Sequence, residues 1–172
     1  KLAEHVGVAV RLLDNVNDIS TVPLKEQKQN MIDKRRIGLG IMGYGSALMM
    51  ARVRYGGKKA LEMTENLMSF ITNSAYSASA DLAKEKGSFP LYDQKKFLQS
   101  KFVQSCLTPE TIKKIKKYGI RNSHLTSIQP TGNSAITANL VSGGCEPIFF
   151  SGYYRTFIVD HPCNQQKRWL GR

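Results

Sequence analysis

The chain has 172 residues, 41% of them hydrophobic, which suits one folded domain and excludes an intrinsically disordered protein. Its 25 Lys and Arg residues outnumber the 13 Asp and Glu residues, and the resulting net charge of +12 attracts anions. The basic residues are spread along the chain without zinc-finger spacing, so charge alone does not indicate a nucleic-acid-binding protein. No run of roughly 18 apolar residues is present, so we expect no membrane span.

The first expected element is an amphipathic helix over residues 2–17. Apolar residues recur there at helical spacing: Leu2, Val6, Ala9, Val10, Leu13 and Val16. Residues 14–18, which are polar except for Val16, end this helix, and Pro23 supports the break. We expect His5 on its exposed side.

Gly38, Gly40 and Gly43 form a G-x-G-x-x-G pattern that we do not interpret as a dinucleotide-binding motif. That motif needs a preceding strand in a βαβ unit, whereas residues 27–36 are polar and residues 46–51 continue a helix. We expect these glycines to permit close packing against a neighbouring element.

A long helix is expected over residues 58–86, because an apolar stripe runs along it. The stripe comprises Ala60, Thr64, Leu67, Ile71, Ala75, Ala78 and Leu82, and it is widened by Met63, Met68 and Phe70. Gly87 is a suitable residue for ending the helix, and Pro90 follows soon after.

Two shorter helices are expected next. Asp93 is a suitable cap for a helix that reaches about Val103. Thr108, followed by proline, begins another helix that ends at Gly119. The lysines of residues 113–117 are expected on its solvated face.

Residues 124–140 have the clearest chemical implication. Alternating apolar residues over 124–128 indicate a strand, Pro130 and Gly132 force a turn, and residues 136–140 can form a short helix. A strand, a turn and a helix N-terminus bring backbone N–H groups together at the positive end of the helix dipole. Such an arrangement can hold a phosphate group.

Small polar residues within this turn add to the prediction. Thr131, Asn133 and Ser134 stand where helix-capping side chains belong, and the hydroxyls of Thr131 and Ser134 are additional donors toward an anion. Short turns of this kind usually bind nothing, so the flanking sequence has to decide.

Four stretches, in this order, resemble the catalytic subunit of ribonucleotide reductase. They are VAVRLLDN (residues 8–15), RRIGLGIMG (35–43), RNSHLTSIQPTG (121–132) and VSGGCEPIF (141–149). The resemblance runs from about Leu2 to Thr156. The Pro-Thr-Gly form of the turn resembles the adenosylcobalamin-dependent enzymes and related bacterial and phage reductases.

The resemblance implies an α/β fold, namely the helix-rich C-terminal part of a ten-stranded α/β barrel. Residues 1–159 would form part of the barrel domain, including a strand over 153–159, and residues 160–172 would be a polar tail without an assigned role. The complete enzyme would replace the 2′-hydroxyl of a ribonucleoside di- or triphosphate with hydrogen by radical chemistry. In this chain the phosphate-binding residues would be Pro130, Thr131, Gly132, Asn133, Ser134 and Ala135.

Glu146 follows this loop closely in sequence, and two readings of it stay open. It is either a neighbour of the active site or a structural hydrogen-bonding residue. His124 has no obvious acid partner and is expected to be structural.

The radical cysteine of such reductases lies in an Asn-x-Cys-x-Glu segment that this chain lacks. We therefore expect the chain to be inactive alone and to need an upstream reductase polypeptide. The resemblance also implies a reductase homodimer, and adenosylcobalamin for the complete enzyme but not bound by this chain.

Cys106, Cys145 and Cys163 are widely spaced and do not suggest a disulfide framework. Cys145 is expected to be a small buried thiol. His161 beside Cys163 is too small a ligand set for a metal site. The chain begins directly in an amphipathic pattern, so we expect no secretory signal and a reducing cytoplasm as its setting.

Two other functions remain open at this point. A non-catalytic remnant would bind nucleotides through the loop without any partner polypeptide. A nucleic-acid-binding protein, the less favoured alternative, would use the lysines of residues 113–117, and its affinity would fall steeply with salt.

Overall fold

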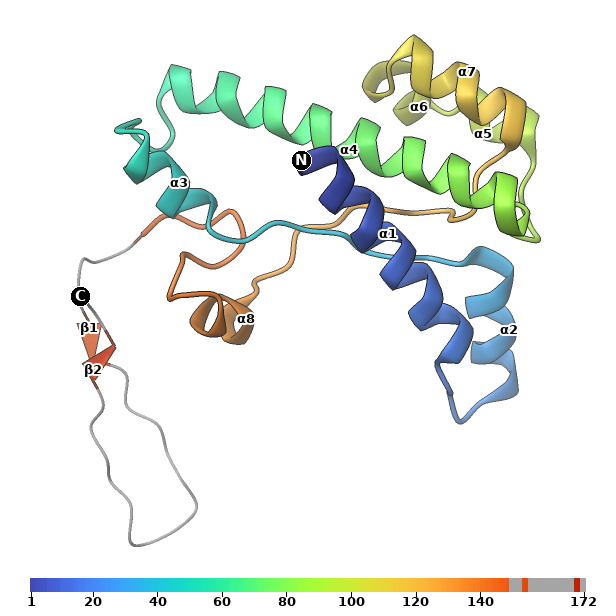
Figure 1. Ribbon diagram of the computed structural model, residues 1–172, viewed down its shortest axis with the longest axis horizontal. Helices are drawn as coiled ribbons and strands as arrows, with labels where there is room; N and C mark the ends of the chain where they lie inside the picture. The colour runs from blue at the N-terminus through green and yellow to red at the C-terminus, as the bar shows by residue number, and fades with distance from the viewer. Residues whose placement is uncertain (149–152, 155–168, 171–172) are drawn as a thin grey trace, which may run out of the picture. The chain divides into compact units, whose positions relative to one another are not determined.

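The computed structural model describes residues 1–148, 153–154 and 169–170 (Figure 1). The elements are α1 (Leu2–Ile19), α2 (Lys25–Lys34), α3 (Tyr44–Met50), α4 (Lys58–Lys86), α5 (Gln94–Gln99), α6 (Lys101–Cys106), α7 (Pro109–Tyr118), α8 (Gly132–Thr137), β1 (Tyr153–Tyr154) and β2 (Trp169–Leu170). The chain divides into two compact units. The first contains residues 1–41 and 56–129, and the second contains residues 42–55 and 130–172.

The first unit is built on α4, the longest helix, against which α1, α6 and α7 pack (Figure 1). The expected stripe of α4 forms the contact: Ile71, Ala75 and Leu82 are buried. They join Val10 of α1 and Ile115 of α7 in one hydrophobic core. Burial of these side chains is the main stabilising contribution in this unit.

Two residues that were expected to widen the α4 stripe are exposed instead. The exposed fraction is 38% for Met63 and 48% for Phe70 among the described residues, whereas Met68 is half-buried. The prediction was wrong for the two exposed residues because the packed face of α4 is narrower than its apolar arc.

Several helix ends follow the expected chemistry. Gly87 ends α4 with a φ of 82°, and Gly119 follows α7 with a φ of 78°, angles that glycine adopts without strain. The hydroxyl of Thr108 accepts a hydrogen bond from the backbone N–H of Thr111, and Asp93 caps α5 in the same way.

The helix expected from Asp93 to Val103 is two helices. Ser100 has extended backbone dihedrals, and its hydroxyl accepts a hydrogen bond from the N–H of Val103 at the start of α6. The serine therefore serves as an N-terminal cap in the middle of the expected helix. Helix α2 was not predicted, because it carries no apolar stripe and none of its residues is buried.

The expected strand at residues 124–128 is an extended segment that pairs in parallel with residues 37–39. The N–H of Leu39 donates to the carbonyl of Leu125 at 2.7 Å, and the N–H of Ser127 donates to the carbonyl of Leu39 at 3.0 Å. A parallel bridge joins Leu39 to Thr126. The described residues thus show a short parallel pairing, which is less than the α/β sheet that was expected.

Gly38 and Gly40 pack closely at this pairing, as expected. A Cβ atom on Gly38 would lie 2.6 Å from the hydroxyl of Ser127, and one on Gly40 would lie 2.8 Å from the Ser127 carbonyl. The side-chain amide of Gln129 donates to the Gly38 carbonyl at 2.7 Å. The G-x-G-x-x-G pattern therefore permits two backbones to approach each other.

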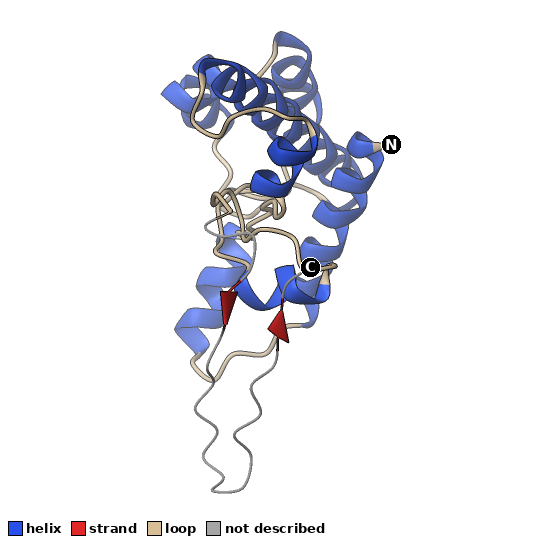
Figure 2. Ribbon diagram, turned by 90° about the vertical axis from the view of Figure 1, so that its left-hand side faces the viewer, coloured by secondary structure: helices blue, strands red, loops and turns tan. Residues whose placement is uncertain are grey.

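In the second unit, α3 packs against residues 141–148, and Tyr44 and Leu48 are buried. Strands β1 and β2 pair antiparallel, with Tyr153 opposite Leu170 (red in Figure 2). Most of the strand expected over 153–159, most of the tail and Cys163 lie outside the described residues. The division at residue 159 stays a prediction.

Candidate functional site

The turn at Pro130 and Thr131 leads into α8, which begins earlier than expected. The helix spans Gly132–Thr137, not residues 136–140, because Thr131 adopts a left-handed conformation with a φ of 50° that starts the helix at Gly132. Figure 1 shows α8 as a single short coil. Ala135 is the buried residue of this helix.

The N-terminal turn of α8 presents free backbone donors to solvent. Among the described residues, the N–H groups of Gly132, Asn133 and Ser134 have no hydrogen-bond acceptor. All three residues are exposed, and a Cβ placed on Gly132 would meet no atom within 4 Å. Unpaired N–H groups at a helix start are suitable donors for an anion.

Thr131 does not cap α8 with its side chain, contrary to expectation. Its hydroxyl oxygen instead accepts a hydrogen bond of 2.7 Å from the N–H of Gly144. Gly143 also lies close to the turn, since a Cβ there would be 2.8 Å from the carbonyl oxygen of Pro130. Gly143 and Gly144 therefore lie next to this turn within the second unit.

Three further predicted site residues, Asn133, Ser134 and Glu146, are at the surface. The side chains of Asn133 and Ser134 are exposed and make no hydrogen bond to a described residue, so the expected capping by them is also wrong. Glu146 is exposed, and its N–H donates to the carbonyl of Gly143 at 2.9 Å. A Cβ atom placed on Gly143 would lie 3.3 Å from Oε2 of Glu146, so the carboxylate is close to Gly143.

Sequence reasoning missed Ser142, which connects this site to α3. Its backbone N–H donates to the Ser46 hydroxyl at 2.9 Å, and its own hydroxyl accepts from the Ser46 N–H at 3.1 Å. The residue lies within a stretch that carries the family resemblance, but nothing in its local pattern indicates a partner 96 residues away.

The first unit contains a buried ionic cluster that was also missed. Asp14 has no exposed surface, and its carboxylate accepts from the Arg35 guanidinium at 2.8 Å and from the Asn122 amide at 2.9 Å. Ser79 donates to the Asn122 side chain at 2.9 Å. Arg35 itself has a φ of 44° at the end of α2. Asp14, Arg35 and Asn122 come from three of the stretches that carry the resemblance.

The pKa of Asp14 is lowered from its ordinary value of 3.8. Burial acts to raise this pKa, but hydrogen bonds from Arg35 and Asn122, together with the charges of Arg35 and Arg121, outweigh burial. The carboxylate is therefore ionised at neutral pH. The hydrogen-bond partners of this carboxylate are side chains of the same chain, so we interpret the cluster as stabilising the fold.

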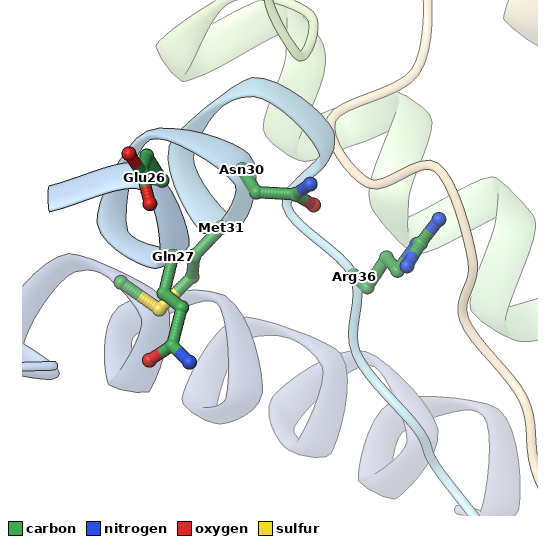
Figure 3. A pocket seen from close by; sticks show the side chains of 5 residues that line it. All are labelled: Glu26, Gln27, Asn30, Met31 and Arg36. Atoms are coloured by element: carbon green, nitrogen blue, oxygen red, sulfur yellow. The ribbon is translucent and has the colours of Figure 1, made fainter. Parts of the chain in front are cut away.

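The first unit has an open hollow of about 440 Å³ beside α2. Figure 3 shows Glu26 and Arg36 at opposite ends of it, with Asn30 between them and Gln27 and Met31 also in the lining. No acid–base pair converges there. The described residues also contain no cluster of three or more His, Cys, Asp and Glu residues that would hold a metal ion. Within that same part of the chain, no helix is both long and apolar enough to cross a membrane.

Other candidate residues are at the surface. His5 is exposed, as expected, and His124 is exposed with Nδ1 3.0 Å from the Ser123 hydroxyl. Cys145 is only half-buried, so the expectation of a buried thiol was too strong. Lys113 and Lys117 are exposed on α7, which confirms the solvated face.

Comparison with known proteins assigns the chain to a family. The family model described as ribonucleotide reductase, barrel domain, matches residues 1–167. The chain belongs to the ribonucleotide reductase barrel-domain family. It is thus a member of an enzyme family, as the resemblance implied.

Individual reductases agree with this assignment. A protein named vitamin B12-dependent ribonucleoside-diphosphate reductase from Mycobacterium tuberculosis (strain CDC 1551 / Oshkosh) is 33% identical over 161 residues, covering 94% of this chain and 21% of the relative. The protein of that name from Thermoplasma acidophilum is 36% identical, covering 90% of the chain and 18% of the relative. Ribonucleoside-diphosphate reductase subunit alpha from Chlamydia pneumoniae is 31% identical, covering 87% and 16%. The chain therefore spans about a fifth of the length of these reductases.

Proposed function

We propose that this chain is a segment of a ribonucleoside di- or triphosphate reductase and contributes the loop that binds the substrate phosphates. The loop comprises Pro130, Thr131, Gly132, Asn133, Ser134 and Ala135. The observation that carries the proposal is the set of free N–H groups at Gly132–Ser134 beside the fixed hydroxyl of Thr131. The complete enzyme would reduce a ribonucleotide to a deoxyribonucleotide by radical chemistry.

The arrangement suits phosphate for two physical reasons. Backbone N–H groups are neutral donors that do not titrate, and three consecutive donors at a helix start can converge on one anionic group. The Thr131 hydroxyl has one lone pair occupied by the Gly144 N–H, so its own proton is available to donate to an anion. The side chains of Asn133 and Ser134 can add two further donors.

An exposed apolar face on α1 supports the view that the chain works within a larger polypeptide. Val8, Leu12 and Ile19 have exposed fractions of 69%, 62% and 78%, although Val6 and Val10 on the other side of α1 are buried. A helix that is apolar on two faces normally packs between two layers. We propose that the rest of the reductase polypeptide covers this second face.

The finer features of the fold and mechanism are part of the same proposal. The parallel segments 37–39 and 124–127 would be neighbouring strands of the ten-stranded α/β barrel. The radical cysteine, with its Asn and Glu partners, would come from outside this chain, and Glu146 would face the active site. A homodimer of the complete reductase, working in the cytoplasm, is the proposed assembly.

Two relatives are named as vitamin B12-dependent, so we propose adenosylcobalamin for the complete enzyme. The described residues of this chain do not fit that cofactor. The hollow of about 440 Å³ beside α2 has the size that suits a small ligand and is lined mainly by polar side chains of that helix. The cofactor would therefore bind elsewhere in the enzyme.

A titration with pyrophosphate, followed by ¹⁵N-resolved NMR of this chain, tests the loop. We expect the amide signals of residues 132–135 to move with pyrophosphate. Thr131→Val should weaken binding about tenfold, because one hydroxyl donor to a charged group is lost, whereas Thr131→Ser should keep most of the affinity. Shifts confined to the lysines of α7, or unchanged binding by Thr131→Val, would contradict the proposed role.

A further inference from the structure

The turn at Ser142–Gly144 contacts the proposed phosphate loop at Gly144 and α3 at Ser142. Gly144 donates its N–H to the Thr131 hydroxyl at 2.7 Å. Two residues earlier, the Ser142 carbonyl accepts from the N–H of Gly43 at 2.8 Å. A three-residue segment thus connects the loop to the start of α3.

Ser142 makes three hydrogen bonds to the start of α3. Ser142 uses its N–H, its carbonyl and its hydroxyl, and its exchange with Ser46 is reciprocal at 2.9 and 3.1 Å. The hydroxyl satisfies the Ser46 N–H, one of the donors that a helix leaves free in its first turn. In effect Ser142 caps α3 from a distant part of the sequence, as the two residues of a capping box do locally.

The two glycines beside this cap are closely approached by residues 141–146. A Cβ on Gly45 would lie 2.5 Å from the carbonyl oxygen of Glu146, and one on Gly43 would lie 3.3 Å from the Cβ of Val141. The Tyr55 hydroxyl donates to the carbonyl of Cys145 at 2.7 Å. Residues on both sides of Gly144 are therefore held against α3 and the chain that follows it.

We propose that Ser142, paired with Ser46, is a positioning residue for the phosphate loop. The pair fixes the Gly144 N–H, this N–H fixes the Thr131 hydroxyl, and the hydroxyl then directs its proton toward the phosphate. Helix α3 is thus the support of the loop, although it supplies no group to the ligand. This inference rests on the proposed function of the loop and names the residues that maintain its geometry.

The test compares Ser142→Ala with the conservative Ser142→Thr and with a control, Ser105→Ala. Ser105 is exposed, and its hydroxyl bonds within its own helix to the carbonyl of Lys101 at 2.8 Å. We expect Ser142→Ala to weaken pyrophosphate binding about fivefold, the effect of one lost hydrogen bond, and Ser142→Thr to restore it. Amide exchange at Gly144 should accelerate in Ser142→Ala, while exchange in the core of the first unit should not change.

The possible results separate the two proposals. The inference would be overturned, and the proposed function left intact, if the wild-type chain binds pyrophosphate and Ser142→Ala binds it with the same affinity as Ser105→Ala. Absence of pyrophosphate shifts at the loop in the wild-type chain would contradict the proposed function, and the inference with it. Should Ser142→Ala lose the fold of the second unit, Ser46→Ala removes the other hydroxyl of the pair and is expected to weaken binding similarly.

Discussion

Asp14 shows how one residue can determine the packing of three distant parts of the chain. It accepts hydrogen bonds from Arg35 and Asn122, and its carboxylate also lies 3.5 Å from the ammonium of Lys86. Removing one member of a buried ion pair leaves the other charge uncompensated. Removing one member of this cluster is therefore expected to lower the stability of the fold strongly.

We predict that Asp14→Asn lowers the free energy of unfolding by about 3 kcal/mol at neutral pH, the lower part of the range for a broken buried pair. Asp81→Asn is the matched control, since Asp81 pairs with Lys114 at 2.6 Å on the surface. A surface pair should contribute less than about 1 kcal/mol. Urea unfolding at pH 7 measures both, and equal effects of the two variants would disprove the special role of Asp14.

The pH dependence of stability gives an independent check. The folded chain holds the pKa of Asp14 below its ordinary value of 3.8, so the unfolded chain binds this proton more readily. The stabilisation is therefore complete above pH 3.8 and is lost as the pH falls through the folded pKa. Asp14→Asn should show a smaller loss of stability in that acidic range than the wild type does.

At the scale of elements, periodicity and capping chemistry predicted α4 and α7 well. The bounds of α4 match the expectation, and Thr108 and Gly119 delimit α7 as expected. Prediction from local sequence failed at two places. Ser100 divides an expected helix because its hydroxyl satisfies a backbone donor, and α2 forms without an apolar stripe.

Helix α1 offers a prediction that distinguishes its two apolar faces. Val10→Ala removes buried methyl groups and should cost about 2 kcal/mol of unfolding free energy. Leu12→Glu, at an exposed position, should change it by less than about 0.5 kcal/mol in this chain. Thermal unfolding of both variants measures the difference. A strong destabilisation by Leu12→Glu would show that the exposed face is already packed within this chain.

At the scale of the whole molecule, the family was predictable from the sequence, because four separated stretches resemble reductases in the right order and the family model matches residues 1–167. The local strand–turn–helix pattern indicated a turn before a short helix, and the phosphate-binding role of that turn stays a prediction. The hydrogen bonds between Ser142 and Ser46 were not predictable, since these residues are 96 positions apart and carry no pattern of their own. The same limit applies to the contact between Asp14 and Asn122.

The central claim is that this chain works as part of a reductase whose radical cysteine lies outside it. Native mass spectrometry of the protein isolated from its own source tests this directly. We expect the 19.2 kDa sequence to be found bound to, or continuous with, a polypeptide that contains an Asn-x-Cys-x-Glu segment. A lone 19.2 kDa species would contradict the claim and would favour a nucleotide-binding remnant without catalytic activity.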